Sequence, residues 1–365
     1  MKVLILTASF GDGHNAAASS VRSAVEALDP ENARVEVLDL LEAVYGRLNR
    51  LARSAYLGMV RHTPGLWRTV YHLLDASPSV TRVGSWTRLL RALGDILAET
   101  EPDVVISTYP LYADVIAELF KDHAERPFRF ITVVTDSISI NGAWHRSPSD
   151  LYCVANEATA EVLLRAGLAE SRLAVTGFPV SPAFLTEQVE SLPPPVGGQP
   201  RRVLVVVNHG QTRPGRTLED LLELEGVHLT VTAGRDSELR AKLHERLDPY
   251  GDRVRIFGWT NLMPRLLLTH HLVIGKAGGA SVQEAIAARC PMIINQTIPG
   301  QEEGNARLIV ESRFGCVVEG RRETLAAVDR AFAEDAKVWS EWRANLERES
   351  RPGAAYRIAE LVLQE

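Results

Sequence analysis

Short runs rich in β-branched residues alternate with longer helical patterns along the chain. In the first half, helical patterns such as Ala16–Leu28 and Tyr112–Asp122 lie between these runs. The candidate strands of this half are Val3–Thr7, Val35–Leu40, Val104–Thr108, Phe130–Thr135, Leu151–Ala155 and Leu173–Thr176. Apolar runs separated by helices are typical of a parallel sheet that helices cover on both faces.

A stretch rich in proline and glycine, residues 186–201, interrupts this alternation and is typical of a linker. The strand pattern then restarts at Val203–Val207, Leu229–Thr232, Val254–Phe257, Leu272–Ile274 and Met292–Ile294. We predict an α/β protein with two Rossmann-like domains, 1–185 and 202–345, whose parallel sheets face a cleft. Residues 346–365 are predicted to form a C-terminal helix that packs back on the first domain. Ligands of such sheets bind at the carboxyl ends of the strands.

Composition narrows the possible function classes. The 365 residues are 45% hydrophobic and 24% charged, which is typical of a globular protein with enough residues for two cores. A formal net charge of -6 does not indicate a nucleic-acid partner. The three cysteines are scattered through apolar runs, so we expect buried reduced thiols rather than disulfides or a metal site. The apolar start is too short for a signal peptide, and no run is long enough to span a membrane, so we expect a cytoplasmic protein.

A glycine loop follows the first candidate strand and ends in Gly13 and His14. Glycines there permit close approach of the backbone to a ligand, and the helix that follows offers free N–H groups to an anion. The loop is not a dinucleotide fingerprint, because Ala16 stands where the third glycine is needed. His14 is a candidate general base, since imidazole titrates near neutral pH, and a capping or structural histidine is the alternative.

Asp136 ends the fourth candidate strand, where the active sites of α/β proteins lie. It is a candidate for orienting His14 or for binding an acceptor hydroxyl, and a turn aspartate is the alternative. Trp144 follows in a loop and is expected either to line an acceptor pocket or to pack.

The strongest motif lies in the second half, where a strand, a glycine pair and a helix follow one another. Gly278 and Gly279 let the backbone approach a diphosphate at the helix N-terminus. Glu284, one turn into the helix, is placed to accept hydrogen bonds from ribose hydroxyls. The loop 298–305 carries the amides and carboxylates that suit a hexose. Ordinary packing between strand and helix explains the glycine turn alone, but not its combination with this loop.

Four motifs in this order resemble the monogalactosyldiacylglycerol synthase and processive diacylglycerol glucosyltransferase family: Gly-Asp-Gly-His, Val-Val-Thr-Asp with a downstream Trp, Lys-Ala-Gly-Gly with Glu-Ala, and Pro-Gly-Gln-Glu with Asn. These are inverting, metal-free enzymes of the GT-B fold, in glycosyltransferase family 28. The resemblance implies a UDP-sugar donor, a 1,2-diacylglycerol acceptor and no cofactor. It makes His14 and Asp136 the catalytic residues. The implied donor-binding residues are Gly13, Gly210, Phe257, Gly258, Trp259, Gly278, Gly279, Ala280, Ser281, Glu284, Gln301, Glu302 and Asn305.

The chain departs from the family pattern at three places. Asp12 replaces a glycine of the first loop, and Asn141 stands where the family has a histidine before the tryptophan. The strand Val203–Val207 leads into Asn208, His209 and Gly210 instead of three glycines. The sequence therefore leaves open which hexose, galactose or glucose, is transferred.

Residues 41–95 carry eight arginines against three acidic residues, a local excess of five positive charges. Aromatic and apolar side chains lie among them, as is typical of an anionic membrane interface. We expect peripheral docking on the inner face of the cell membrane, with an arginine-rich helix face in solvent as the alternative. The candidate acceptor and membrane residues are Trp67, Arg68, Tyr71, Trp86 and Trp144.

Three other functions remain open on the sequence alone. The first is the related transferase that adds N-acetylglucosamine to a polyprenyl-linked muramyl acceptor. The second is a UDP-sugar epimerase of the same fold, which would have no use for the basic aromatic segment. The third is a nucleotide-sugar sensor without activity, which the joint presence of His14, Asp136 and Glu284 disfavours.

Overall fold

The structure is a computed structural model that describes residues 1–62, 86–138, 140–187, 189, 192–207, 214–299 and 302–364. Contacts within the chain divide it into two compact units. The first unit comprises Met1–Pro182, Pro299–Gly304 and Arg351–Glu365, and the second comprises Ala183–Ile298 and Asn305–Ser350. The stretch 186–201, expected as a linker, therefore belongs to the second unit.

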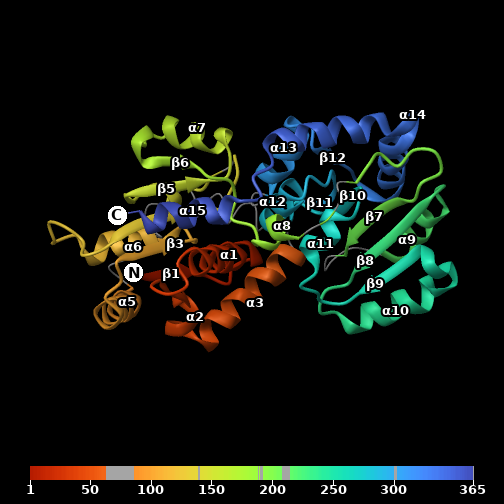
Figure 1. Cartoon of the computed structure of the whole chain (residues 1–365). Coiled ribbons are helices and arrows are strands. Elements are labelled where there is room, and N and C mark those ends of the chain that lie inside the picture. The colour runs from red at the N-terminus through yellow and green to blue at the C-terminus, as the bar shows by residue number, and fades with distance from the viewer. Residues whose placement is uncertain are drawn as a thin grey trace. The chain divides into compact units, whose positions relative to one another are not determined.

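The first unit is built on six parallel strands in the order β2-β1-β3-β4-β5-β6 (Figure 1). The strands are β1 (Lys2–Thr7), β2 (Arg34–Asp39), β3 (Val104–Ser107), β4 (Arg129–Val133), β5 (Leu151–Val154) and β6 (Leu173–Val175). The helices are α1 (Asp12–Leu28), α2 (Leu40–Tyr45), α3 (Arg47–His62), α5 (Thr87–Thr100), α6 (Leu111–Leu119), η2 (Gly142–Trp144), α7 (Glu157–Arg165), η3 (Glu170–Arg172) and α15 (Ala354–Leu363). The chain leaves β1 toward β2 on one side and continues at β3 on the other. The direction of winding therefore reverses between β1 and β3, which is where ligands bind in such sheets.

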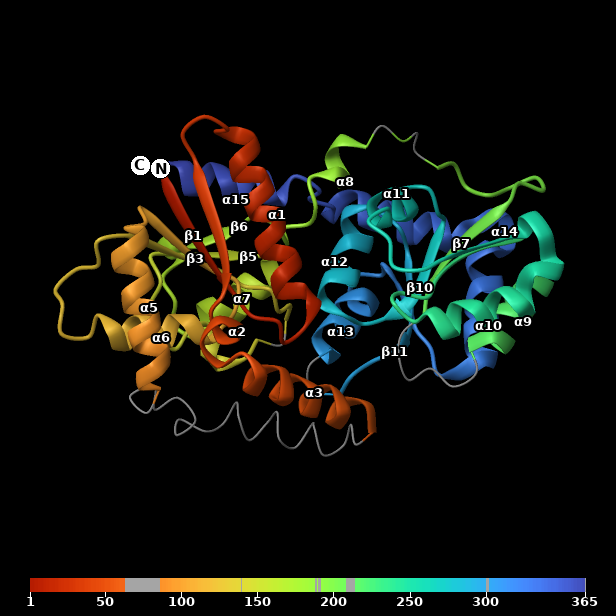
Figure 2. The same ribbon diagram turned by 90° about the horizontal axis from the view of Figure 1, so that it is seen from below.

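Strand β1 is buried on both faces, and its alternating side chains belong to two separate cores. Val3 and Ile5 pack with α1 and α15, whereas Leu4 and Leu6 pack with α5 and α6 (Figure 2). Burial on both faces explains why this strand reads as one apolar run instead of an alternating pattern.

The second unit has six parallel strands in the order β12-β11-β10-β7-β8-β9. The strands are β7 (Arg201–Val206), β8 (Val227–Thr232), β9 (Val254–Phe257), β10 (Leu272–Lys276), β11 (Met292–Gln296) and β12 (Gly315–Val317). The helices are α8 (Ala183–Thr186), α9 (Pro214–Glu223), α10 (Ser237–Leu247), η4 (Asp248–Arg253), α11 (Met263–Leu268), α12 (Gly279–Ala287), α13 (Glu303–Glu311) and α14 (Gly320–Glu349). The winding of this sheet reverses between β7 and β10.

The two faces of the second sheet are covered unequally over β8 and β9. Right-handed connections from β7 through β8 to β9 place α9 and α10 on one face, where Leu222 and Leu243 pack against Leu229 of β8. The connection from β9 back to β10 runs in the opposite direction, so α11 lies on the other face. Because α11 has only six residues, it leaves part of that face open.

The C-terminal helix α15 packs beside α1 in the first unit through Ile358 and Val362. The turn that precedes α15 lies against Gly177, which has a φ of 91°. A Cβ atom at Gly177 would lie 2.8 Å from the Cβ of Ala354 and 2.9 Å from that of Arg351. Docking of the C-terminal segment therefore requires both the backbone conformation and the small size of glycine here.

We expect Gly177→Ala to lower the free energy of unfolding by about 2–4 kcal/mol, because the cost of the positive φ and the cost of the close contact are added together. Gly167→Ala is the matched control, since Gly167 has a φ of 95° but no atom within 4 Å of an added Cβ. The free energy of unfolding of the control should fall only by the cost of the positive φ, about 1–2 kcal/mol. Chemical denaturation measures both values, and equal losses would contradict the predicted contact.

Candidate active site

The loop after β1 is held by a chain of hydrogen bonds that fixes the start of α1. The Thr7 hydroxyl donates to Asn15 Oδ1 at 2.9 Å, and Asn15 Nδ2 donates to the Ser9 hydroxyl at 3.0 Å. The Ser9 amide donates in turn to Asp39 Oδ2 at 2.9 Å. Gly11 has a φ of 126°, which only glycine adopts readily. The loop therefore presents the first turn of α1, including Gly13 and His14, in a defined position.

His14 is the third residue of α1, and its ring is oriented by two groups from neighbouring strand ends. Its Nδ1 lies 2.8 Å from the backbone oxygen of Thr108 and 2.8 Å from the hydroxyl of Thr135. A carbonyl oxygen only accepts, so Nδ1 carries the proton and donates it. The lone pair is then on Nε2, which makes no hydrogen bond in the described part of the chain.

Burial lowers the pKa of His14 to about 4, although the bond to Thr108 acts in the opposite direction. The imidazole is therefore neutral at pH 7, and Nε2 can accept a proton. Sequence reasoning missed Thr108 and Thr135 as functional residues. The available signal was their place at the ends of two adjacent candidate strands.

Asp136 lies three residues after β4, near His14 but without a hydrogen bond to it among the described contacts. Its Oδ2 accepts from the indole Nε1 of Trp144 at 2.7 Å. Burial raises the pKa of Asp136 to about 6, and the indole bond counteracts this. The ring of Trp144 lies 6.2 Å from that of His14, centroid to centroid. The structure thus brings the three residues together, but Thr108 and Thr135 orient His14, not Asp136.

Trp144 is fully buried, so it packs in the core and does not face a membrane. Asn141 caps the short helix η2 that carries this tryptophan, since its Oδ1 accepts from the Ala143 amide at 2.9 Å. The residue that departs from the family pattern therefore positions the indole that binds Asp136.

In the second unit, β10 ends and α12 begins at the glycine pair. Gly278 is the N-cap, with a φ of −66°. The helix geometry leaves the N–H groups of the first turn, Gly279, Ala280 and Ser281, without helical partners. Glu284 lies one turn further on. Burial raises the pKa of its carboxyl to about 7, and the described residues give it no hydrogen bond or ion pair. The helix start can receive an anion, and the carboxylate can accept hydrogen bonds from hydroxyls.

The other predicted donor residues lie at further strand ends of the same sheet or near them. Phe257 ends β9, Gly258 follows, and the ring of Trp259 is 65% exposed with the guanidinium of Arg235 5.4 Å from its centroid. Asn305 Nδ2 donates to the backbone oxygen of Ala277 at 3.0 Å, which ties α13 to the loop after β10.

Two of the remaining predicted site residues, Glu302 and Trp86, are placed by their burial and by the unit or core to which they belong. Glu302 is buried and lies in the segment that groups with the first unit. Trp86 is half-buried and packs with the core around α5 and α6. The remaining candidates, Gly210, Gln301, Trp67, Arg68 and Tyr71, lie outside the described residues. No helix within the described ranges has the length and apolar character needed to cross a bilayer.

Comparison with known proteins gives relatives along nearly the whole chain. A family model described as monogalactosyldiacylglycerol (MGDG) synthase matches residues 14–180. The processive diacylglycerol beta-glucosyltransferase of Bacillus subtilis is 25% identical over 92% of this chain and 87% of that protein. The chloroplastic monogalactosyldiacylglycerol synthase of Spinacia oleracea is 29% identical over 100% of this chain and 73% of that protein. This chain is a relative of the diacylglycerol glycosyltransferases. The resemblance predicted from the four motifs is confirmed.

Solved structures confirm the fold that these glycosyltransferase motifs predicted. MurG from Acinetobacter baumannii has a TM-score of 0.63 and 14% identity, covering 99% of this chain and 98% of that one. The UDP-GlcNAc 2-epimerase of Neisseria meningitidis has a TM-score of 0.61 and 14% identity, covering 100% of both. The fold is GT-B. Because MurG and an epimerase both have it, the fold alone does not distinguish the reactions.

The bond between Trp144 and Asp136 predicts a measurable pKa change in this diacylglycerol glycosyltransferase relative. Trp144→Phe removes the N–H that favours the charged carboxylate, so the pKa of Asp136 should rise above its value of about 6. Carboxyl-carbon NMR titration measures it. Trp86→Phe, which removes an indole from the same unit without touching Asp136, should leave it unchanged. An unaltered pKa in Trp144→Phe would contradict the assignment.

Proposed function

We propose that this chain is an inverting glycosyltransferase that moves a hexose from a UDP-sugar to 1,2-diacylglycerol and so makes a membrane glycolipid. The observation that carries the proposal is the relation to proteins named as diacylglycerol glucosyltransferase and monogalactosyldiacylglycerol synthase over 92% and 100% of the chain. The cluster of His14, Asp136 and Trp144 supports it, because it supplies a neutral base beside a carboxylate.

His14 serves as the general base of the proposed transfer. The acceptor hydroxyl gives its proton to Nε2 while its oxygen forms a bond to the anomeric carbon. The bond from that carbon to the diphosphate oxygen breaks on the opposite face, UDP leaves with the electron pair, and a β-glycoside results. The imidazolium that forms keeps its Nδ1–H on the Thr108 carbonyl, and this bond strengthens as the ring becomes charged. Asp136 supports deprotonation of the acceptor.

The first turn of α12 holds the diphosphate in this proposal, and Glu284 holds the ribose hydroxyls. Backbone N–H groups at a helix start stabilise the negative charge that develops on leaving UDP, and we propose that no metal ion is needed. Transfer requires the two units to bring the donor and His14 together. Phe257 and Trp259 flank the uracil, and Glu302 and Asn305 contact the sugar or its phosphates.

Docking on an anionic membrane supplies the lipid acceptor. Helix α3 exposes 63% of Leu48 and 66% of Leu51 beside Arg47 and Arg50. Apolar side chains between cations suit the interface of an anionic bilayer, where each basic residue near the surface adds about 1 kcal/mol of attraction. We propose peripheral binding to the cytoplasmic face of the cell membrane.

The direct test is product analysis after incubating the protein with vesicles of diacylglycerol and anionic lipid and a panel of UDP-sugars. A glycolipid with one hexose is expected, and the donor that yields it identifies the sugar. Transfer only to a polyprenyl-linked muramyl acceptor would replace the proposal by the MurG-type reaction. Interconversion of free UDP-sugars without a lipid product would replace it by epimerisation.

We expect His14→Ala to lower kcat by about 10²–10⁴-fold, because a general base typically contributes this much. The dissociation constant of UDP should stay nearly unchanged, since His14 contacts the acceptor and not the nucleotide in this proposal. Steady-state kinetics and calorimetry separate the two effects. Equal losses of turnover and UDP affinity would rule out the role as base.

Donor binding should depend on pH through Glu284. Ribose hydroxyls donate to the ionised carboxyl, whose pKa is raised to about 7 in the free protein. The affinity for the donor should therefore increase by about tenfold between pH 6 and pH 8. Because a UDP-sugar itself does not titrate in this range, calorimetry with the active donor reports the protein group.

Glu284→Gln is the matched variant, since it keeps the shape but neither titrates nor carries charge. It should bind the donor about 10–100-fold more weakly at pH 8 and show no pH dependence. A pH profile that persists in Glu284→Gln would assign the titration to another group.

A further inference from the structure

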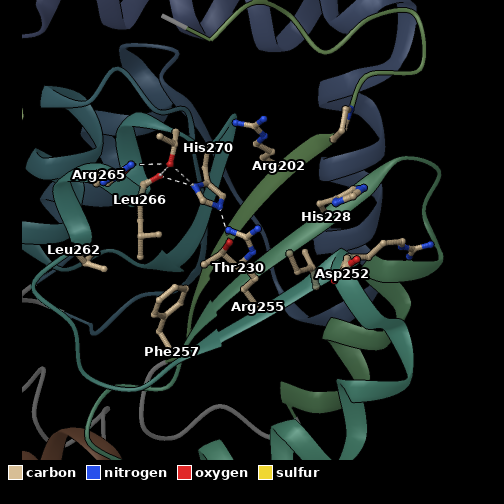
Figure 3. A pocket seen from close by; sticks show the side chains of 14 residues that line it. Arg202, His228, Thr230, Asp252, Arg255, Phe257, Leu262, Arg265, Leu266 and His270 are labelled. Carbon is tan, nitrogen blue, oxygen red and sulfur yellow. Dashed lines mark hydrogen bonds between the residues drawn. The ribbon is translucent and has the colours of Figure 1, made fainter. Parts of the chain in front are cut away.

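A cavity lies in the second unit, apart from the first turn of α12. It has a volume of about 560 Å³ and opens between α11 and the face of β7, β8 and β9 that α9 and α10 do not cover (Figure 3). This size is within the range of small-molecule sites. None of the residues proposed above to hold the diphosphate or ribose lines it.

Basic side chains form rows across the floor of this cavity. The parallel register pairs Arg202 with His228 on β7 and β8, and Thr230 with Arg255 on β8 and β9. Residues two apart on a strand point to the same face, so Arg202 and Arg255 share it with His228 and Thr230. Arg253, the last residue of η4, lines the cavity just before β9 begins. Figure 3 shows Arg202, His228 and Arg255 over the same strands. A fourth arginine, Arg265, lines the cavity from α11.

These four arginines have no ion-pair partner among the described residues. Nε and Nη2 of Arg253 are buried without a hydrogen bond there. Asp252 is the one acidic residue among those that line the cavity. By contrast, Arg246 of the same unit binds both oxygens of Glu219, at 2.5 and 2.6 Å. A guanidinium group that has no carboxylate partner in a partly enclosed site favours the binding of an anion.

The two histidines of the cavity do not supply further charge. His270 Nδ1 donates to the Leu266 carbonyl at 2.6 Å, and its Nε2 accepts from the Thr230 hydroxyl at 2.7 Å. Burial lowers the pKa of His270 to about 4 with the help of Arg202 and Arg255, although the bond to Leu266 acts in the opposite direction. Burial also lowers the pKa of His228, as do Arg253 and Arg202. The positive charge of the arginines therefore lowers the pKa of both histidines, and Asp252 is the one carboxylate of the lining that opposes this charge.

We propose that this cavity binds the phosphate group of a phosphate monoester, with the arginines on the phosphate and the organic part against Leu262 and Leu266. A phosphate monoester carries about −1.5 to −2 charges at pH 7 and three acceptor oxygens, which planar guanidinium groups match well. The cavity is larger than a phosphate ion needs, and its apolar wall fits an attached carbon body. The ligand's source is either a lipid headgroup or a soluble ester.

The test is calorimetry on the full chain with UDP at saturation, so that the donor site is occupied. The probes are inorganic phosphate, glycerol 3-phosphate and monomeric dihexanoylphosphatidic acid. An ester should bind more tightly than inorganic phosphate. Preference for dihexanoylphosphatidic acid assigns the site to a lipid headgroup, and equal binding of glycerol 3-phosphate assigns it to a soluble ester. Equal binding of all three probes, or of none, would overturn the proposal.

Arg255→Gln should weaken the ester by about tenfold or more, because it removes a charged hydrogen-bond donor. Arg313→Gln is the matched control, since Arg313 pairs with Glu341 on the surface of the same unit. Arg255 is exposed, so the variant should keep the melting temperature; if it does not, Arg202→Gln replaces it. Unchanged affinity in the folded variant would overturn the proposal. The experiment measures binding and not glycosyl transfer, so a failure of the proposed reaction and a failure of this proposal can be told apart.

Discussion

The bond from His14 Nδ1 to the Thr108 carbonyl is the interaction on which the candidate active site depends. Leu6 and Ser107 are partners in the parallel register, so the loops after β1 and β3 start side by side. The Thr108 amide donates to the Leu6 carbonyl at 3.0 Å and so fixes the peptide that receives the imidazole proton. Without that carbonyl, either nitrogen could carry the proton. Because β1 and β3 are neighbours where the winding reverses, the proton of His14 is fixed on Nδ1 and the lone pair is on Nε2.

Two half-buried carboxyls, Asp136 in the first unit and Glu284 in the second, are stabilised to different extents. Asp136 already has an indole donor, whereas Glu284 has no partner in the described residues. The pKa of Glu284 in the folded protein, about 7, exceeds its ordinary value of 4.5. The stability gained from its protonated form is therefore complete below pH 4.5 and is lost as pH rises through about 7. A ligand whose hydroxyl groups donate hydrogen bonds to the ionised carboxyl would offset this loss of stability. Glu284 therefore lowers the stability of the free protein at neutral pH but can strengthen the binding of such a ligand.

Much of the fold could be predicted from the sequence, because apolar runs such as Val203–Val207 signal buried parallel strands by themselves. The strand Gly315–Val317 was missed, since three residues give no pattern. His14, Asp136 and Glu284 could be singled out as candidates because each follows a strand end within a motif. The roles of Thr108 and Thr135 depend on which strands become neighbours, which local sequence does not encode. Whether Trp144 lines an acceptor pocket or packs stayed open, because the burial of a loop tryptophan is a tertiary property.

The same topological rule explains both the open loops at the start of α12 and the cavity lined by arginines. The winding of the second sheet reverses between β7 and β10, which leaves the loops at the carboxyl ends open to a ligand. It also places the short α11 on the face of β8 and β9 opposite α9 and α10, so Arg202 and Arg255 point into a space that no long helix of the described residues fills. Phe257 ends β9 and lines that space as well. A ligand there would contact the strand whose end flanks the proposed uracil position.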